Sequence, residues 1–557
     1  MLAHKHITKI IAVVMAVAVC LCLLAVAFSG QLTAWAGDKG ITQEYETALF
    51  DTSSVISVNI QMDEDDWNDM LENATEEKYY QCNVEVNGTM FYQVGIRPKG
   101  NTSLTSIASD PTTDRYSFKL EFDHYVDGQT CFGLDKLILN NNYADATNMK
   151  EALIYDMYQY LGADASLYNY AKISVNGTYW GVYLALEAVE DSFQLRNYGT
   201  EDGKLYKPES MDMGGGMPDD MPEGKPDEMP EPPENMGDGK DFGNGEPPES
   251  MEMDSGGADL NYTDDDPDSY ETIWDGEITK TSKADHKRVI KALKNISEGS
   301  DLEAYMDIDN LLRYMAVHVF SVNEDSLSGM MAHNYYLYES GGRLNLIPWD
   351  YNLALGGMGG MGGGMPGSPG DSDTEQSSGA TSLVNSPIDD AFSGTEFFDT
   401  LMENETYHSQ YYAYLQQLVS EYINGGGFDA FYERVRSQID ELVKTDPTAF
   451  YSYDEYETAA ETLYQVVKLR GQSIQGQLDG SIPSTEEAQR NSDALIDASS
   501  LDVSVMGSMN MGGGDGPGGP DGADGPGDPN GFDPSQAGGK GQAPAKKQAE
   551  KPENESK

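Results

Sequence analysis

The sequence predicts one α+β domain of two lobes, and three observations lead to this prediction. Short runs of alternating apolar and polar residues dominate residues 51–207, which indicates a β-rich N-terminal lobe. Helical periodicity dominates residues 263–485, which indicates a mostly helical C-terminal lobe. Between them, residues 208–262 are rich in Met, Pro, Gly and acids without an apolar period, so we expect a disordered insert. One domain with insertions explains this order better than two unrelated domains.

The first lobe begins with strands and then changes its period. Runs such as "YQCNVEVNG" and "RYSFKLEF" alternate and end in turn residues. The Asn-Gly pairs at 87–88 and 176–177 predict hairpin turns, because these residues accept positive φ. In "NMKEALIYDMYQYLG" apolar residues recur every four positions from Met149 to Leu161, and Gly162 is a suitable terminator. The sequence therefore predicts one helix between two sets of strands.

The second lobe is predicted to consist of helices around one strand pair. "HKRVIKALKNI" and "DIDNLLRYMAVHVFSV" have helical patterns, whereas "HNYYLYES" and "RLNLIPWDYNLAL" indicate two strands joined by a Gly-Gly turn. The Gly-rich stretch at 356–382 is expected to be a flexible insert, and three further helices follow it. From residue 490 the chain becomes polar, so residues 490–557 are expected to form a disordered tail.

The composition limits the classes of function. Asp and Glu number 94 against 35 Lys and Arg, and the net charge of −59 argues against a nucleic-acid partner. The chain has no GxSxG elbow or Walker A sequence, and its GxGxxG matches lie only in the Gly-rich low-complexity stretches rather than at a turn from a strand into a helix. Hydrolysis by two acids stays open because acids are so many, but no specific spacing favours it.

The N-terminal residues 1–36 predict export. They combine a basic start, a continuous apolar run and the small-x-small sequence "AWA" of a signal-peptidase site. The apolar run is long for a signal peptide, so a membrane anchor through residues 10–28 stays open as the alternative. Both alternatives place the rest of the chain outside the cell or on its surface. The two later cysteines, Cys82 and Cys131, are consistent with one disulfide or with two separate buried thiols.

The most specific chemical signal begins at residue 319 and reads "VFSVNEDSLSGMMAHNYYLYESGGRLNLIPWDYN". A helix leads into a loop that carries Asp325, Asn334 precedes one strand, and the second strand ends at Asp350. Phosphoryl transfer needs a carboxylate to orient the attacking hydroxyl and further oxygen ligands to hold Mg²⁺ on the phosphates. The order of these parts therefore predicts a phosphate and metal site at one edge of the strand pair. Taken alone, Asp350 also fits a simple turn between a strand and a linker.

Several motifs together resemble the CotH-type spore-coat protein kinases, a family of atypical, secreted, kinase-like proteins. The resemblance covers residues 55–207 and 265–480, and it implies a two-lobed atypical protein-kinase-like fold with disordered insertions and tail. The motifs are "RPKGNTS", "YSFKLEF", "LDKLILNNNYADATNMKEALIYDMYQYLG", "VNGTYWGVYLALEAVEDSF", "LYKP", "HNYYLYE" and "IPWDYN".

The resemblance also implies an activity and its residues. Members resembling the spore-coat enzyme transfer phosphate from ATP to Ser residues of secreted or surface proteins, with Mg²⁺ or Mn²⁺. By position, Asp325 is expected to be the catalytic acid or base, Asp350 the metal-binding Asp and Asn334 a second metal ligand. Contacts to ATP are expected from Lys119, Arg97, Lys99 and Glu187.

Other interpretations of the ATP-contacting candidates stay open. Lys119 alternates with apolar neighbours and fits the solvent face of a strand, and Glu187 fits a packing role at a strand end. Arg97 and Lys99 flank a Pro beside a glycine-containing turn, where they suit phosphate, but they also fit pairing with the surplus acids.

Two functions from different classes follow. The first is an exported ATP-dependent kinase that transfers the γ-phosphate to Ser or Thr of secreted, coat or surface proteins. The second is a catalytically weak or inactive surface scaffold or adhesion protein, which the acidic inserts and the long tail fit equally well. Comparing labelling by ATP in the wild type with that in variants of Asp325 and Asp350 distinguishes the two.

Overall fold

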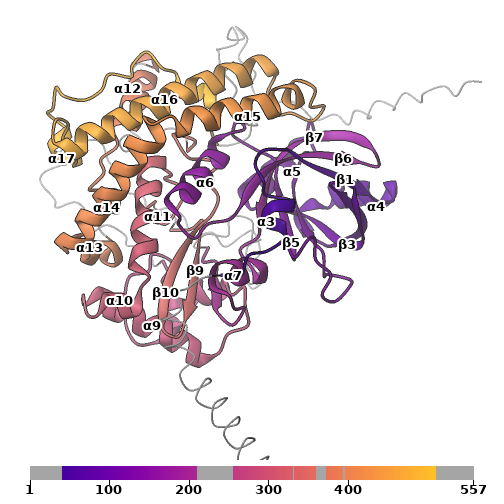
Figure 1. Cartoon of the computed structure of the whole chain (residues 1–557), viewed down its shortest axis with the longest axis horizontal. Helices are drawn as coiled ribbons and strands as arrows, with labels where there is room; N and C mark the ends of the chain where they lie inside the picture. Colours follow the sequence, from indigo (N-terminus) through magenta and orange to yellow (C-terminus); the bar gives the residue numbers. More distant parts are fainter. Residues whose placement is uncertain (1–39, 210–254, 330–331, 359–371, 393–394, 510–557) are drawn as a thin grey trace, which may run out of the picture. The chain divides into compact units, whose positions relative to one another are not determined.

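Seven strands of the N-terminal half close into a barrel, at the right of Figure 1. Their order around the barrel is β1-β2-β3-β4-β5-β7-β6, and parallel pairing of β1 with β6 closes it. The structure is a computed structural model that describes residues 40–209, 255–329, 332–358, 372–392 and 395–509. The barrel strands are β1 (Ile56–Gln61), β2 (Tyr80–Val86), β3 (Thr89–Lys99), β4 (Ser117–Glu121), β5 (Lys136–Asn140), β6 (Tyr168–Val175) and β7 (Thr178–Glu187).

The two predicted Asn-Gly hairpins are confirmed. Asn87 and Gly88 join β2 to β3 with φ of 48° and 83°, and Asn176 and Gly177 join β6 to β7 with φ of 50° and 82°. Positive φ at both central residues gives a turn whose twist matches that of the flanking strands. These local turns fix the register of two strand pairs of the barrel.

The prediction of a two-lobed protein-kinase-like fold is wrong. The strands form a closed seven-stranded barrel with helices beside it, although the overall mixture of α and β is as predicted. Closure depends on β1 lying parallel to β6, with Val58 opposite Ile173. Alternation of residues shows which face of a strand is buried but not which distant strand it joins, so the pattern did not indicate closure.

The N-terminal half also carries helices between its strands. The helix predicted from the four-residue period is α6 (Lys150–Leu161), which ends at Gly162 with φ 71°. It leaves the barrel after β5 and packs between the barrel and the helical half of the protein. The other helices of this half are α3 (Tyr45–Ala48), α4 (Glu64–Glu72), η1 (Ala74–Glu76), α5 (Thr102–Ser109) and α7 (Asp191–Tyr198).

The C-terminal half consists of helices and a three-stranded sheet of order β10-β9-β8. The predicted strand pair is β9 (Tyr335–Ser340) and β10 (Arg343–Pro348), to which β8 (Lys204–Tyr206) adds an edge. The longer helices are α9 (Lys283–Ser297), α11 (Ile308–Ser321), α12 (Ser372–Asn385), α14 (Glu405–Gln417), α15 (Gly427–Lys444) and α16 (Tyr453–Asp479). The shorter ones are η2 (Pro267–Tyr270), α8 (Glu271–Asp275), α10 (Leu302–Tyr305), α13 (Glu396–Met402), η3 (Leu418–Ile423), α17 (Glu486–Gln489) and η4 (Val503–Met506).

Two large hydrophobic clusters organise these parts. One fills the barrel, and the other joins α6, the three-stranded sheet and the helices of the C-terminal half. Strand β5 serves both, because Leu137 and Leu139 point into the barrel while Ile138, on the opposite face, joins the helical cluster. The barrel therefore packs against the helical half through the outer faces of β5, β6 and β7.

Several sequence predictions fall wholly or partly outside the described residues. These are the export signal or anchor at 1–36, residues 210–254 of the first insert, 359–371 of the second and 510–557 of the tail. Helix α12 begins inside the second insert, and η4 of the expected tail packs against α16, so residues 490–509 belong to the folded part. None of the described helices has the length and apolar character needed to cross a membrane.

The structure distinguishes between the two alternatives for the cysteines. Cys82 and Cys131 are both buried and free, so the separate-thiol alternative holds. Burial raises the pKa of the Cys82 thiol to about 12, which keeps it protonated.

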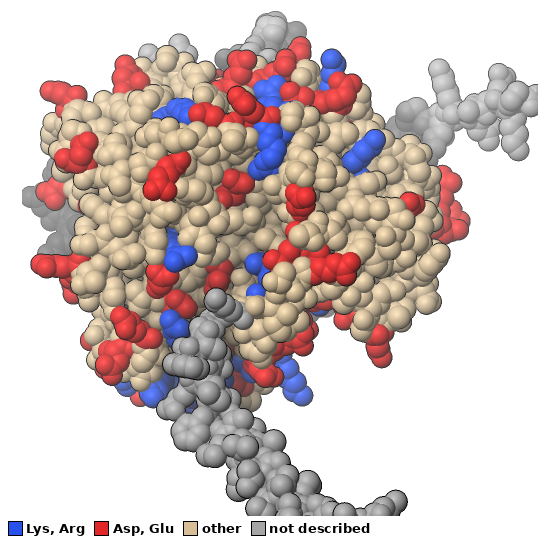
Figure 2. All heavy atoms as spheres, viewed as in Figure 1, with Lys and Arg blue, Asp and Glu red and all other residues tan. Residues whose placement is uncertain are grey.

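Acidic side chains are scattered over the face seen in Figure 2, with Lys and Arg among them, so on that face the negative charge is not gathered in one patch.

Candidate functional site

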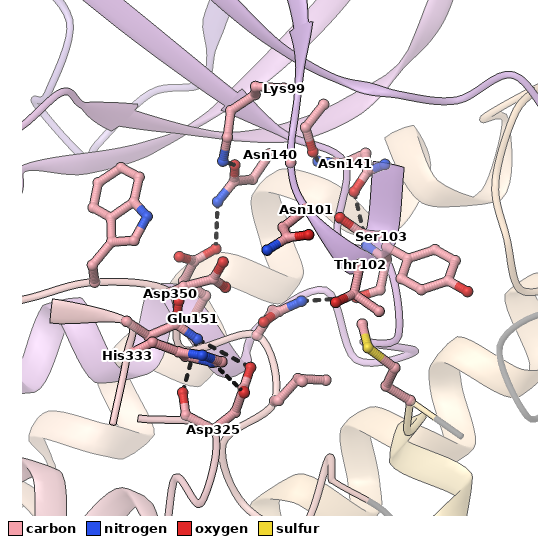
Figure 3. A pocket seen from close by; sticks show the side chains of 18 of the residues that line it. Lys99, Asn101, Thr102, Ser103, Asn140, Asn141, Glu151, Asp325, His333 and Asp350 are labelled. Atoms are coloured by element: carbon pink, nitrogen blue, oxygen red, sulfur yellow. Dashed lines mark hydrogen bonds and ion pairs between the residues drawn. The ribbon is translucent and has the colours of Figure 1, made fainter. Parts of the chain in front are cut away.

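A polar cavity of about 310 Å³ lies where the barrel meets the loops that follow α11 and β10. Figure 3 shows it from close by. The barrel contributes the ends of β3 and β5, and the helical half contributes the loops with Asp325 and Asp350. Its lining includes Glu77, Arg97, Lys99, Asn101, Thr102, Ser103, Asn140, Asn142, Tyr143, Glu151, Lys207, Asp325, His333, Asn334, Trp349, Asp350, Leu353, Met358 and Met509.

A chain of hydrogen bonds runs through the barrel side of the cavity. The Lys99 Nζ donates to Asn140 Oδ1 at 3.1 Å, and the Asn140 Nδ2 donates to Glu151 Oε2 at 2.9 Å. Lys99 also lies over the Trp349 ring, 5.6 Å from its centroid. Glu151 is the second residue of α6 and is 3% exposed, and its Oε1 has no hydrogen-bond partner of normal geometry among the described residues. A buried acceptor without a donor is costly unless a ligand supplies one, so Glu151 suits a bound cation or donor.

Burial and neighbouring charges perturb the pKa values of the two carboxyl groups beside Lys99. Burial, followed by the charge of Asp350, raises the pKa of Glu151 to about 8. Burial also raises the pKa of Asp350, and it lowers the pKa of Lys99. One buried and one half-buried carboxyl group next to a single lysine favour binding of an additional positive charge.

Asp325 also lines the cavity, below Glu151 and Asp350 in Figure 3, and is held by two neighbours. The His333 Nε2 is 2.6 Å from Asp325 Oδ1, and Asn334 Nδ2 donates to the backbone carbonyl at 2.8 Å and to Oδ2 at 3.0 Å. Figure 3 shows His333 and Asp325 turned toward one another. Both carboxylate oxygens are therefore fixed in direction, as a group that accepts a proton from a bound hydroxyl must be.

One buried histidine joins the two loops that carry the acids. His318 on α11 contacts Tyr351 Oη through Nδ1 at 3.0 Å and Ser328 Oγ through Nε2 at 2.7 Å. Burial lowers the pKa of His318 to about 3, so the ring is neutral at physiological pH. Tyr351 follows Asp350 and Ser328 follows Asp325 by three residues, so His318 couples the positions of both loops.

Four non-glycine residues that line the cavity have left-handed backbone conformations, and Glu77, with φ of 47°, is one of them. Asn334, Asp350 and Asn142 have φ of 57°, 56° and 59°. Asn and Asp tolerate this region better than other non-glycine residues, but it still costs conformational energy. Such residues concentrate at functional sites, where surrounding contacts hold them in place.

Positive charge and backbone N–H groups lie on the side of the cavity formed by β3 and α5. Arg97 pairs with Glu77, with Nη1 and Oε1 2.7 Å apart, and Lys207 pairs with Glu209. Asn101, Thr102 and Ser103 form the N-terminus of α5 and face the cavity (Figure 3). A helix N-terminus beside basic side chains is an arrangement that binds phosphate.

The structure brings together five of the seven residues selected from the sequence and leaves two elsewhere. Lys119 is ion-paired with Glu190, away from the cavity lining. Glu187 is fully buried and holds Arg196, with Oε2 and Nη2 2.6 Å apart. The ATP contacts predicted for Lys119 and Glu187 stay predictions, and neither residue lines the cavity. The five that line the cavity are Arg97, Lys99, Asp325, Asn334 and Asp350.

Sequence reasoning missed three polar residues of the site. Glu151 is in the first turn of a helix, where an acid is common for local reasons, so nothing in the pattern indicated its burial. Asn140 ends a strand, but nothing in "LNNNY" distinguishes it from the two Asn residues that follow it. His333 directly precedes Asn334, and this adjacency was a usable signal for a partner of Asp325.

The residues offer a partial rather than complete metal site. In the described ranges, no three His, Cys, Asp or Glu side chains converge closely enough to hold a metal ion. Mg²⁺ is commonly held by one or two carboxylates together with substrate phosphates. Asp350 and Glu151 fit that donor set, because both carboxyl groups line the cavity, Glu151 buried and Asp350 half-buried.

Comparisons with known proteins agree on one family. A protein-family profile described as "CotH kinase protein" matches residues 96–474. The inner spore coat protein H of Bacillus subtilis (strain 168) is 26% identical over 230 residues, which is 41% of this chain and 52% of that protein. The chain thus spans about half the length of this curated relative. The matched range contains all the acidic and basic residues of the cavity except Glu77.

Proposed function

Because the chain belongs to the CotH kinase protein family, we propose that it transfers the γ-phosphate of ATP to Ser or Thr of another protein. The observation that carries this proposal is the convergence of three carboxyl groups with basic groups in one cavity. Asp325, Asp350 and Glu151 line it together with Lys99 and Arg97. Phosphoryl transfer depends mainly on positioning and on compensating the charge of the phosphates, and this set supplies groups for both.

Asp325 is the residue proposed to accept the proton of the attacking hydroxyl. Its carboxylate is 15% exposed, so a hydroxyl reaches it from the cavity, and His333 and Asn334 hold its orientation. A carboxylate in this role aligns the hydroxyl with the phosphorus and receives its proton as the new bond forms. The fixed geometry lowers the entropy cost of that alignment.

Asp350 and Glu151 are proposed to hold Mg²⁺ or Mn²⁺ together with the nucleotide phosphates. When bound, the ion supplies positive charge that compensates the charge on the phosphates. Lys99 lies beside both carboxyl groups and is proposed to contact the phosphates as well. Arg97 and Lys207 are proposed to leave their Glu partners and bind phosphate oxygens, because basic side chains form strong charge-assisted hydrogen bonds with phosphate.

The location and the protein substrate are part of the same proposal. The Bacillus relative is named as a spore coat protein, and we propose that this chain also acts outside the cytoplasm, on secreted, coat or surface proteins that contain Ser. The N-terminal export signal predicted from the sequence supports this location. Anchoring through residues 10–28 is the alternative to release.

Labelling with radioactive ATP in the presence of Mg²⁺ or Mn²⁺ tests the proposed activity. Asp325→Ala and Asp350→Ala are expected to lower phosphate transfer at least about 100-fold. Asp429→Ala is the matched control, since Asp429 is a partly exposed acid on α15 that pairs with Lys468 outside the cavity. Equal labelling by the wild type and all three variants would contradict the roles assigned to Asp325 and Asp350.

A second function is favoured by the name of the relative rather than by the cavity. A coat protein contributes to an assembly, and this chain is alternatively a surface scaffold or adhesion protein with little or no catalysis. In that case wild-type protein binds its envelope partners but labels neither itself nor them with phosphate. Absence of labelling together with intact envelope binding would favour the scaffold.

A further inference from the structure

Residues 501–509 return to the cavity after the last long helix, and we call them the C-terminal strap. The strap includes η4, which packs against α12 and α16, and it ends at Met509, which lines the cavity. Met506 is fully buried in the helical cluster, whereas Met509 packs against the barrel cluster. The strap therefore connects the two clusters at the cavity, beyond residue 474, where the family match ends.

The strap holds the loop that joins β5 to α6. The Ala146 backbone N–H donates to the Met506 carbonyl at 3.1 Å, and Lys150 Nζ donates to the Gly507 carbonyl at 3.1 Å. Lys150 is fully buried, so this carbonyl is a principal partner of its charge, together with nearby Asp145. A buried ammonium group is stable only when such partners are in place.

This loop requires external support because its backbone is strained. Asn142, Ala144 and Asn148 all have left-handed conformations, with φ of 59°, 60° and 52°. Strain of this kind persists only where surrounding contacts determine the conformation. The same loop carries Asn142 and Tyr143 into the cavity and leads directly to Glu151.

The strap also holds the loop that follows Asp350. The Met509 backbone N–H donates to the Gly357 carbonyl at 2.8 Å. Met509 then completes an apolar end of the cavity, whose other members belong to or pack on the barrel cluster. These members are Tyr143, Leu353 and Met358.

Gly507 is the position where the strap comes closest to the loop. Its φ is 83° and its ψ 146°, a region that only glycine enters readily. A Cβ there would lie 2.7 Å from the Ala144 carbonyl oxygen and 2.9 Å from the Ala146 nitrogen. Both atoms are backbone, so a side chain at 507 forces the strap and the loop apart.

We infer that the C-terminal strap forms part of the binding site and is needed for ligand binding. It positions the loop that leads to Glu151 and the loop that follows Asp350, and Met509 supplies an apolar wall for the ligand. Since the other end of the cavity is charged, the ligand that uses both ends has an anionic part and an apolar planar part, as a nucleotide has. This inference rests on the proposed function for the identity of the ligand but not for the role of the strap.

Full-length point variants test the inference. Gly507→Ala is expected to weaken binding of a fluorescent ATP analogue with Mg²⁺ about tenfold, as strain of this kind predicts. It should also speed hydrogen exchange of the backbone amides of residues 142–149. Gly480→Ala is the matched control, because Gly480 has φ 77° but no atoms near the added Cβ, and it should change neither measurement. Met509→Ser, at a partly exposed position, should weaken binding severalfold while leaving the melting temperature and the exchange unchanged.

The possible outcomes distinguish a failure of the inference about the strap from a failure of the proposed function. Wild-type affinity in Gly507→Ala and Met509→Ser, with wild-type exchange in the loop, would overturn the inference. If the wild-type protein binds no nucleotide, the proposed function fails, and the exchange measurement alone decides the role of the strap. Faster exchange in residues 142–149 of Gly507→Ala but not of Gly480→Ala would then support it, and equal exchange would overturn it.

Discussion

Replacing Asp446 by leucine should remove the charge that neutralises Arg115, which is buried between the barrel and the helical half. Arg115 precedes β4 and Asp446 lies between α15 and α16, and the two side chains are 2% and 1% exposed. The Arg115 Nη1 donates to both carboxylate oxygens, at 3.0 Å and 2.8 Å. Asp446 also accepts a bond of 2.9 Å from the Val182 backbone N–H, so one carboxylate joins two barrel segments.

The expected loss of stability follows from what remains after the change. The guanidinium stays buried, because it also donates to the carbonyls of Val182 and Asn141 at 2.6 Å and 3.2 Å. Removing one partner of a buried ion pair costs about 3–5 kcal/mol of unfolding free energy. Typical domains have only about 5–15 kcal/mol in total, so the effect is large. In the double variant Arg115→Met/Asp446→Leu no charge is buried, and roughly half or more of the loss should be recovered.

Urea unfolding followed by tryptophan fluorescence measures these free energies. The matched control is Glu486→Gln, which removes an exposed pair with Arg490 whose side chains are 68% and 66% exposed. This control should change stability by less than about 0.5 kcal/mol. A loss below about 1 kcal/mol for Asp446→Leu, or a double variant no more stable than the single one, would refute the reasoning.

Three further predictions concern the cavity and its supports. Glu151→Gln should keep the fold but lower phosphate transfer about tenfold or more, measured by labelling with ATP, because an amide is a weaker metal ligand than a carboxylate. His318→Phe should lower the unfolding free energy by about 2 kcal/mol in thermal unfolding, because Tyr351 and Ser328 lose a buried partner. Burial, followed by the charge of Asp307, raises the pKa of Asp164 to about 6, so the folded state retains a proton that the unfolded state has already lost. Stability should therefore fall as the pH rises from about 4 to about 6, and Asp164→Asn should remove about 3 kcal/mol of this dependence in urea titrations at both pH values.

Asp325 and Asp350 were accessible from sequence because their signals are local. Each follows a helix or strand whose period is clear, and both fall in one continuous segment of about thirty residues between positions 319 and 352. Lys99 and Arg97 were accessible for a similar reason, since they flank a Pro before a glycine turn. Local patterns of this kind place a residue at the end of an element, which is where sites form.

Lys119 and Glu187 show where the same reasoning reaches its limit. Lys119 faces outward from its strand as the alternation predicts, but its neighbour in space is Glu190, which lies on a distant part of the chain. Glu187 ends a strand as predicted, yet Arg196 on α7 neutralises it inside the protein. The charge partner of Lys119 lies 71 residues away and that of Glu187 lies nine residues away on another element, and no periodicity in the sequence indicates either pairing.

The sequence by itself determined the strands, the hairpin turns, helix α6 and the segment with the catalytic candidate Asp325 and the metal-ligand candidate Asp350, because each depends on periodicity and turn chemistry within a few residues. Only the tertiary structure decided that β1 and β6 close a barrel, that Glu151 joins Asp350 beside Lys99, and that residues 501–509 return to the cavity. These features depend on pairing between segments more than 100 residues apart. Such pairing is selected by the combined burial and hydrogen bonding of the whole fold, to which any one segment contributes only a small part.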